Sequence, residues 1–451
     1  MRWSLKRPRG GLWGHPDFMK LWIGQSISEF GSQVSQLAIP WLAAVELHAS
    51  PIQFSLLGVF GFLPFILFAL PAGVWVDRLQ RRPILIVSDA TRAFLLASIP
   101  LLWALGVLEM WHLLAIQFVV GVFTVFFDVS YQSYLPSLVD RASLVEGNAK
   151  LQTTVSTSQV AGPSVAGALI AAITAPYAIL LDAVSFLVST AYMFRIRKQE
   201  VIPAQQAGAA KPKMLPELKE GLAYVVRHRY LRPIAACTGS SNFFGMITFT
   251  IFLLYAVRTL HMSSFLVGFV FAMSGAGAIV GSLVAHRVQQ AIGVGPAIVV
   301  PAILFSVSAV AFPLAPQTHP VPVLVVAFLL FGYGGVTYNI TQVSLRQAIT
   351  PERLQGRMNA SMRWIVWGTI PLGQITGGAI GSAWGLRTAL WVGAIGSFFT
   401  ALPVLLSPVR SLKEVPETAA SAGTAAQAEM AGGVIEPGAM TTQPGAASAD
   451  A

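Results

Sequence analysis

Long apolar segments recur along most of the chain, with short polar connections between them. A membrane-spanning helix needs roughly 20 mostly apolar residues, and on that measure we expect about twelve helices. They fall near residues 18–45, 53–76, 83–106, 111–137, 148–173 and 176–196 in the first half, and near 231–257, 264–286, 295–316, 320–346, 357–384 and 386–408 in the second. The pattern predicts an all-α integral membrane protein.

Two landmarks recur at a common offset along the chain. The charged segment 73–82 has a counterpart at 281–287, and Asn148-Ala149 has one at Asn359-Ala360. Both offsets are about 210 residues, which indicates a parallel internal repeat. We therefore expect two six-helix bundles related by this repeat, an architecture in which secondary transporters hold a substrate where the two copies meet.

Composition and charge placement support a membrane protein. Hydrophobic residues make up 55% of the chain, the mean hydropathy is +0.66 and only 11% of residues are charged, against roughly 25% in ordinary globular domains. Of the 29 lysines and arginines, we place all but Arg258 and Arg387 on one side. By the positive-inside rule that side is the cytoplasm. The net charge of +10 therefore indicates the orientation of the chain in the membrane and not nucleic-acid binding. We expect a multi-pass plasma-membrane protein with both termini cytoplasmic.

The connections and tails give the domain boundaries. We expect a basic cytoplasmic N-terminus, a first bundle, a cytoplasmic linker, a second bundle and a disordered cytoplasmic tail, over residues 1–17, 18–197, 198–230, 231–409 and 410–451. The linker carries Leu215, Leu218, Leu222 and Val225 at helical spacing with charges between them. This spacing predicts an amphipathic helix on the inner face of the membrane.

Residues for enzyme chemistry do not assemble into a pattern. The single cysteine, Cys237, has no histidine near it in sequence, and we interpret it as a packing residue. The seven histidines fall near span ends or in loops, without the i,i+4 pair that binds zinc on a helix. No phosphate-binding loop of the Walker type is present. We expect no enzyme activity, no metal and no bound cofactor.

Polar side chains line one face of the first span. Gln25, Glu29, Ser32, Gln33 and Gln36 follow three- and four-residue spacing, which lipid does not tolerate. Polar clusters also occur in spans four, seven and ten, a step of three helices. The alternative is interhelical hydrogen bonding, worth about 0.6 kcal/mol per contact. For the whole set we predict a substrate cavity lined by Gln25, Glu29, Gln33, Gln36, Asp128, Tyr131, Gln132, Asn242, Tyr338, Asn339 and Gln342.

Three further charges lie at membrane depth, where a charge is costly and marks a functional candidate. Asp89 and Arg92 are three residues apart in span three, so they can neutralise each other on one helix face. Asp182 lies near the outer end of span six. For these residues both a structural role and a role in coupling are open.

The segment Gly73 to Arg82, which contains Asp77 and Arg78, resembles motif A of the major facilitator superfamily. Gly162-Pro163 resembles the antiporter motif of that superfamily. The segments 127–132 and 347–361 are similar to its macrolide and enterobactin exporter branch, and the likeness extends over residues 18 to 408. The resemblance implies that Asp77 closes an inner gate against the opposite bundle and that Arg78 and Arg82 brace it.

The sequence departs from the family pattern at two positions. Gln117 stands where the family usually has an arginine, and Ala285 replaces the aspartate of the second motif A. Coupling through that arginine is then excluded, so a proton carrier must be a buried carboxylate. Such a group can bind a proton on one side and release it on the other. Glu29 is our first candidate, with Asp128 and Asp182 as alternatives.

The resemblance implies an exporter of a small amphipathic molecule, such as a drug, macrolide or siderophore-like compound. It would work by alternating access with the proton gradient as energy source. Its partners would be the lipid bilayer, the substrate and protons; we expect a monomer and no nucleic acid. An importer or lipid transporter of the same fold is an alternative, and so is a nontransporting receptor or scaffold whose function lies in its tails.

The orientation can be tested by labelling. Cysteines introduced at Gln80 and Gln205, in a Cys237→Ala background, should react with a membrane-impermeant maleimide only when the reagent reaches the cytoplasm, because both positions follow the basic side of the chain. Labelling of either position from outside intact cells would overturn the predicted orientation.

Overall fold

The computed structural model describes residues 11–76, 78–198 and 214–414, which fold as helices without a strand. Asp77, Gln205 and most of the 410–451 tail lie outside the described residues. The N-terminal half consists of α1 (Pro16–Val45), α2 (Pro51–Val76), α3 (Arg81–Ala104), α4 (Met110–Leu138), α5 (Leu144–Ile173) and α6 (Ala175–Phe194), with short 3-10 turns at Gly11–Gly14 and Arg141–Ser143.

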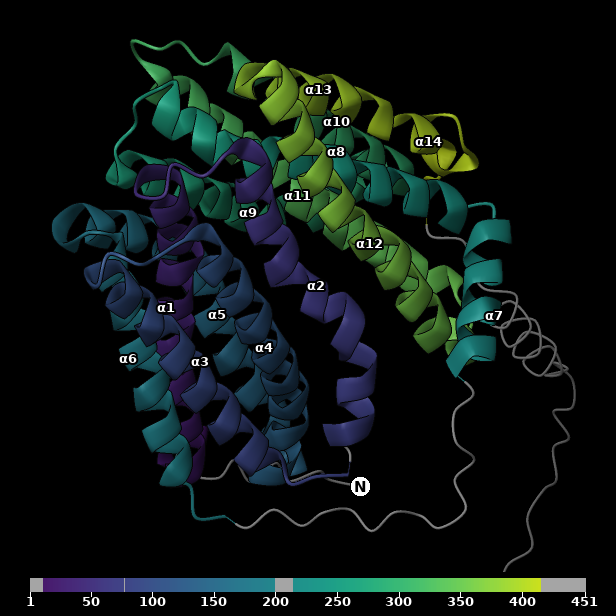
Figure 1. Ribbon diagram of the computed structural model, residues 1–451. Helices are drawn as coiled ribbons and strands as arrows, with labels where there is room; N and C mark the ends of the chain where they lie inside the picture. The colour runs from purple at the N-terminus through teal and green to yellow at the C-terminus, as the bar shows by residue number, and fades with distance from the viewer. Residues whose placement is uncertain (1–10, 77, 199–213, 415–451) are drawn as a thin grey trace, which may run out of the picture.

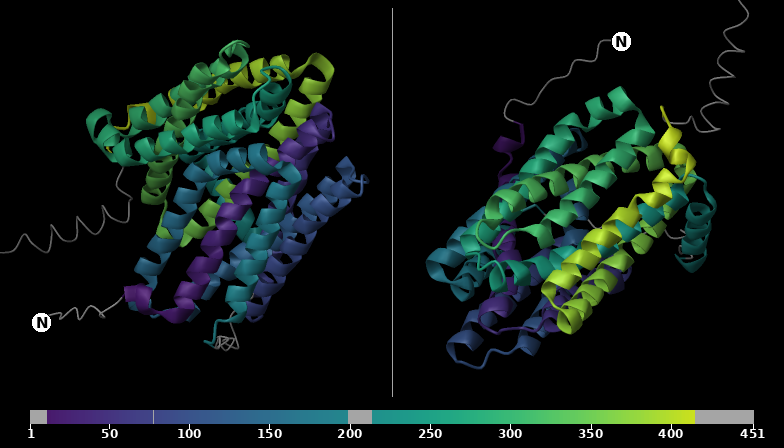
Figure 2. Two further views of the ribbon diagram at one scale, coloured as in Figure 1. Left: turned by 90° about the vertical axis from the view of Figure 1, so that its left-hand side faces the viewer. Right: turned by 90° about the horizontal axis from the view of Figure 1, so that it is seen from above.

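The C-terminal half follows a separate helix, α7 (Met214–Arg227). It consists of α8 (Leu231–Arg258), α9 (Ser264–Ile292), α10 (Val294–Leu314), α11 (Pro320–Ile349), α12 (Glu352–Trp384), α13 (Leu386–Thr400) and α14 (Leu402–Leu405), and a 3-10 turn at Pro408–Ser411. Figures 1 and 2 show the two halves as neighbouring groups of helices.

Within the described residues, nine helices are long and apolar enough to cross a membrane. The long helices α1, α5 and α12, of 30, 30 and 33 residues, are not among the nine. They carry many polar side chains, including the stripe of α1, and these lower their hydropathy. These three helices are therefore less apolar than the other nine because each has a polar face, which we expect to point into the protein.

Sharp turns join several consecutive helices. Gly293, between α9 and α10, and Gly385, between α12 and α13, have φ values of +87° and +90°. Glycine adopts this left-handed region without a steric penalty because it has no Cβ. These turns reverse the chain within one residue and bring consecutive helices side by side.

The hydrophobic core is continuous at one end of the molecule and divided at the other. The largest buried cluster contains residues of both halves, among them Leu42 and Ile170 from the first and Phe252 and Phe328 from the second. These residues lie towards the end that the sequence predicts to be extracellular, which we call the outer end. Towards the opposite, inner end, the described residues form one cluster in each half. The halves are therefore joined at the outer end.

Two helix pairs make the joint, α5 with α9 and α2 with α12. A Cβ on Gly268 of α9 would lie 2.2 Å from the Pro163 carbonyl oxygen of α5. Ser264 Oγ donates a hydrogen bond to the Gly167 carbonyl at 3.1 Å. Small residues thus let the backbones touch. Figure 1 shows α2 and α12 diverging towards their inner ends.

Helix α7 forms where the linker pattern predicts it, but its apolar side contacts protein. Val225 is fully buried in the inner cluster of the C-terminal half, and a Cβ on Gly221 would lie 2.5 Å from the Arg357 carbonyl oxygen of α12. Glu220 pairs with Arg353 and Arg357. The C-terminal part of α7 thus packs against α12 and α8, and its position on the inner face of the membrane stays a prediction.

The joint between the halves can be weakened at a single position. Gly268→Ala places a methyl group against a backbone oxygen that cannot move without shifting α5, so we expect it to lower the free energy of unfolding by about 1–3 kcal/mol. Gly335→Ala is the matched control, since a Cβ at Gly335 meets no atom within 4 Å. Thermal unfolding in detergent measures both. Equal stability of the two variants would show that the glycine contact is dispensable.

Candidate functional site

A cavity of about 420 Å³ lies between the two halves, on the inner side of their shared core. Every residue that lines it is uncharged. Amide and hydroxyl groups come from Gln33, Gln36, Gln117, Gln159, Gln374, Thr250 and Ser274, and aromatic rings from Phe54, Phe249, Phe271 and Phe328. Both halves contribute to each kind. The cavity thus offers hydrogen-bonding amides on an apolar, aromatic background, as small-molecule sites do.

The polar stripe of α1 divides between two environments. Gln33 and Gln36 line the cavity. Glu29 lies one turn nearer the inner end and accepts a hydrogen bond from Ser158 Oγ of α5 at 3.3 Å. Gln25 lies a further turn inward, half-buried. Of the predicted cavity residues on α1, the structure brings the outer two to the cavity and leaves Glu29 at its inner side.

Helix α4 brings a second carboxylate to the same region. Asp128 is solvent-exposed and lies within electrostatic range of Glu29 and Arg92. Tyr131 stacks on Phe127 with ring centroids 5.7 Å apart, whereas Gln132 is exposed. None of these α4 residues lines the cavity itself. The two carboxylates instead form a pair on the inner side of the N-terminal half.

The polar residues predicted on α8 and α11 form hydrogen bonds within their own half. Asn242 donates to the Val366 carbonyl of α12 at 3.1 Å. The Tyr338 hydroxyl hydrogen-bonds Thr238 at 2.7 Å, and Gln342 donates to Asn339 at 3.0 Å. The cavity lining includes none of these predicted residues. Their hydrogen bonds within their own half fit the alternative of interhelical bonding, and their place in a substrate cavity stays a prediction.

The glycine-proline pair of α5 lies where three helices meet. A Cβ on Gly162 would lie 2.5 Å from Gln33 Cβ, so the missing side chain lets α1 approach α5. Pro163 lines the cavity, and its carbonyl touches Gly268 of α9. The pair therefore positions a cavity glutamine and the joint between the halves at once.

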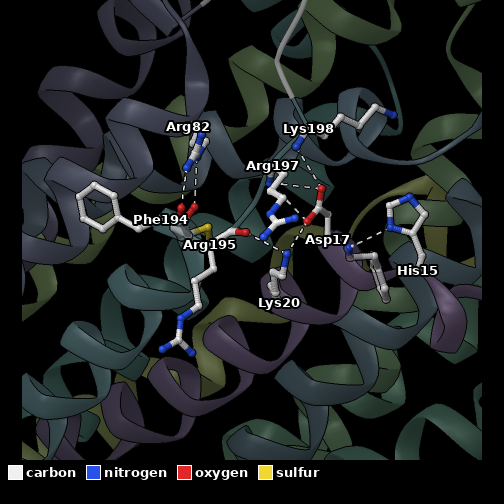
Figure 3. Close-up of polar contacts among 10 residues, drawn as sticks. His15, Asp17, Lys20, Arg82, Phe194, Arg195, Arg197 and Lys198 are labelled. Carbon is white, nitrogen blue, oxygen red and sulfur yellow. Dashed lines mark hydrogen bonds and ion pairs between the residues drawn. The ribbon is translucent and has the colours of Figure 1, made fainter.

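The basic residues of the predicted gate bind within the N-terminal half. Arg82 donates from Nε to the Met193 carbonyl at 3.1 Å and from Nη2 to the Phe194 carbonyl at 2.8 Å. These carbonyls end α6, where a cation stabilises the helix dipole. Figure 3 shows the arrangement. Gly73 has open space beside it, Arg78 is exposed, and Asp77 lies outside the described residues.

The same end of α6 is held from α1. Lys20 donates to the Arg195 carbonyl and to Asp17, both at 2.8 Å. Asp17 also accepts the backbone N–H groups of Arg197 and Lys198 (Figure 3). The inner ends of α1, α3 and α6 therefore move as one unit.

The remaining charges at membrane depth are tied into the fold. Arg92 and Asp89 form the ion pair that their spacing predicts, and the Arg92 guanidinium lies over the rings of Phe127 and Phe186. Asp182 is 1% exposed and accepts a hydrogen bond from Ser185 Oγ at 3.0 Å. These contacts support a structural role, although Asp89 Oδ2 and Arg92 Nε are buried without a hydrogen-bond partner among the described residues.

Several cavity residues escaped the sequence reasoning. Gln159 ends a run of polar residues in α5 that was not singled out from the sequence, and Gln374 lies in a mostly apolar part of α12. Gln117 was noted only as a departure from the family pattern. Arg363 was also not singled out from the sequence; it lies three turns inside α12, since that helix begins at Glu352. Across the described residues, no cluster of histidine, cysteine and acidic side chains could hold a metal ion.

Residues 13–431 match the family described as transmembrane secretion effector. The multidrug efflux pump Tap of Mycobacterium tuberculosis (strain ATCC 25618 / H37Rv) is 25% identical over 417 residues, covering 86% of this chain and 92% of Tap. Macrolide efflux protein A of Streptococcus pyogenes is 24% identical over 48% of this chain and 52% of its own. The MFS-type transporter YfiS of Bacillus subtilis, uncharacterized, is 29% identical over 46% and 49%. The chain thus spans about half the length of these last two.

Solved transporter structures have the same fold. A bacterial homologue of the iron transporter ferroportin, in an inward-facing state, aligns with a TM-score of 0.66 over 86% of this chain and 98% of its own, at 14% identity. The nucleoside transporter NupG aligns with a TM-score of 0.69 over the same shares, at 12% identity.

Proposed function

This chain belongs to the transmembrane secretion effector family of the major facilitator superfamily, and we propose that it is a proton-coupled exporter of a small amphipathic molecule. The observation that carries the proposal is the uncharged cavity of glutamines and phenylalanines between the two halves. Such a lining suits a ligand with an apolar body and a few hydrogen-bonding groups. The exporter names of Tap and macrolide efflux protein A favour this direction of transport.

In this proposal α1, α5 and α12 also cross the membrane, which gives twelve spans in two six-helix bundles over residues 18–197 and 231–409. Their polar faces turn inward, towards the other helices. Both termini are then cytoplasmic, and the protein works in the plasma membrane as a monomer. The linker between the bundles, residues 198–230, then also lies on the cytoplasmic side.

Alternating access follows from the divided core. The structure corresponds to the state closed at the outer end, in which the halves share one hydrophobic cluster. The opposite state requires the α5–α9 and α2–α12 contacts to open and the two inner clusters to meet. Arg82 and Asp17 tie together the inner ends of α1, α3 and α6, so the N-terminal half can rotate as a rigid body.

A panel assay in inside-out vesicles tests the function. The cytoplasmic face is then outside, so an exporter driven by protons should accumulate its substrate when the lumen is made acidic. The panel should hold cationic, neutral and anionic aromatic amphiphiles. We expect accumulation in vesicles that contain the protein and none in vesicles that lack it. The accumulation should collapse when the pH gradient is dissipated. Accumulation only with the opposite gradient would identify an importer, and none with any compound would favour a receptor or scaffold.

Glu29 is the proposed proton carrier, with Asp128 beside it. Its carboxylate lies between the cavity and the inner end, so it can meet water from one side at a time as the halves rotate. We expect Glu29→Gln to abolish gradient-driven accumulation while substrate exchange without a gradient persists, because the amide keeps the shape and loses the proton. Asp140→Asn is the control, since Asp140 is an exposed carboxylate at the inner surface. A wild-type response of Glu29→Gln to the gradient would move the role to Asp128 or Asp182.

A further inference from the structure

The C-terminal half carries an excess of positive charge, whereas residues 18–197 of the N-terminal half have nine acids and nine lysines and arginines. From residue 221 to residue 413 the sequence has twelve lysines and arginines and one acid, Glu352, which begins α12. The acids at membrane depth, among them Glu29 and Asp128, all belong to the N-terminal half. The potential around the C-terminal half is therefore positive over its inner part, and a cleft lined by one sign of charge attracts ligands of the other.

Arg363 is the most deeply placed of these cations on α12. It lies about 16 Å along the helix from Glu352 at about 1.5 Å per residue, and its side chain is exposed. None of the ion pairs formed by the described residues involves Arg363. By contrast, Arg353 and Arg357, at the start of the same helix, both pair with Glu220. In the proposed twelve-span bundle, a cation three turns inside a helix and without an ion-pair partner is a candidate for a functional role.

The contacts of Arg363 place it on the side of α12 that faces the other half. Its guanidinium lies over the Trp367 ring, 5.0 Å from the centroid. The Trp367 ring in turn packs edge-on against Phe62 of α2 at 5.9 Å, and Phe62 stacks on Phe65 at 5.9 Å. Arg363 therefore stands at the edge of an aromatic surface formed by both halves.

This surface leads to the cavity. Gln374 lies eleven residues after Arg363, three helical turns along the same face of α12, and it lines the cavity together with Gly58 of α2. Phe62 is one turn from Gly58. A ligand can thus rest its aromatic body on Phe62 and Trp367, with polar groups towards Gln374, and reach Arg363 with one end.

A second arginine strengthens the positive potential nearby. Arg346 of α11 donates to Gln342 at 3.1 Å and to Asn359 at 3.0 Å, so neutral amide oxygens hold it and its charge is not cancelled by these partners. Asn359 lies one turn before Arg363 on α12. Arg346 thus adds positive charge on the inner side of Arg363.

We propose that Arg363 and the adjoining Trp367–Phe62 surface form a subsite for an anionic group, so that the preferred substrates are aromatic carboxylates and similar anionic amphiphiles. The inference rests on the proposed transport function and adds the charge of the substrate. Arginine suits the role because its planar guanidinium can bind a carboxylate with two parallel hydrogen bonds. Glu29 and Asp128, on the other half, repel the anionic end and so favour one orientation of the ligand.

Two probes that differ only in charge test the subsite. 2-Naphthoate and its uncharged amide, 2-naphthamide, share one ring system. With the full-length protein in detergent, binding of tritiated 2-naphthoate and its displacement by each unlabelled probe give the two affinities. We expect the wild type to prefer 2-naphthoate by about ten-fold, equivalent to 1.4 kcal/mol. Arg363→Gln should bind the two probes with about equal affinity, because its affinity for 2-naphthoate falls. Arg363→Lys should retain part of the preference for 2-naphthoate.

Arg353→Gln is the matched control, because it removes a guanidinium from the same helix that is paired with Glu220; it should keep the full preference. Thermal unfolding of each variant establishes that it is folded. No binding of 2-naphthoate at millimolar concentration, equal affinities in the wild type, or an unchanged preference in Arg363→Gln would each overturn the subsite. So would an equal loss for both probes, which indicates a structural role.

The vesicle panel separates this inference from the function on which it rests. If cationic or neutral amphiphiles accumulate in response to the gradient while 2-naphthoate shows no preference, the subsite is wrong and the exporter stands. If 2-naphthoate binds with the expected preference but no panel compound accumulates, the transport function is wrong and the anion subsite stands.

Discussion

Direct contact between the backbones of α5 and α9 is the constraint on which the rest of the structure depends. It is possible because Gly167 and Gly268 lack side chains at the crossing, and it brings Pro163 into both the joint and the cavity wall. Packing of this kind has two discrete arrangements, joined or separated, and does not deform gradually. The shared outer core, the cavity beneath it and the separate inner clusters all follow from the joined arrangement.

Polar groups are distributed according to what surrounds them. The cavity contains amides and hydroxyls and no charge, so a ligand there meets groups that can donate and accept without a large desolvation cost. The acids within the long helices, Glu29, Asp89, Asp128 and Asp182, belong to the N-terminal half, whereas Arg363 of the C-terminal half has no ion-pair partner among the described residues. A transporter built this way can separate the two tasks of its cycle, with protons on one half and the charged end of the substrate on the other.

Arg82, a residue of the segment that resembles motif A, makes its hydrogen bonds within the N-terminal half. Arg82 caps the carbonyls that end α6, and Lys20 and Asp17 complete the network there (Figure 3). Helix ends expose unpaired carbonyls, which cationic side chains can satisfy. The inner ends of α1, α3 and α6 are therefore joined by contacts within the N-terminal half alone. Helix α7, docked on α12, gives the C-terminal half a comparable brace.

The sequence by itself determined the membrane-protein class, the positions of most helices and the local contacts. Hydropathy and helical periodicity are local properties, and so is the three-residue spacing that pairs Asp89 with Arg92. Tertiary structure alone decided which polar residues face the cavity. Gln33 and Gln36 reach it, whereas Asn242 and Tyr338 find partners within their half. The rotation and crossing angle of each helix decide between these outcomes. The helical spacing of polar residues in the sequence is the same whether their side chains face a ligand cavity or another helix. Gln117, Gln159 and Gln374 meet across three helices far apart in sequence, and no spacing along the chain encodes that.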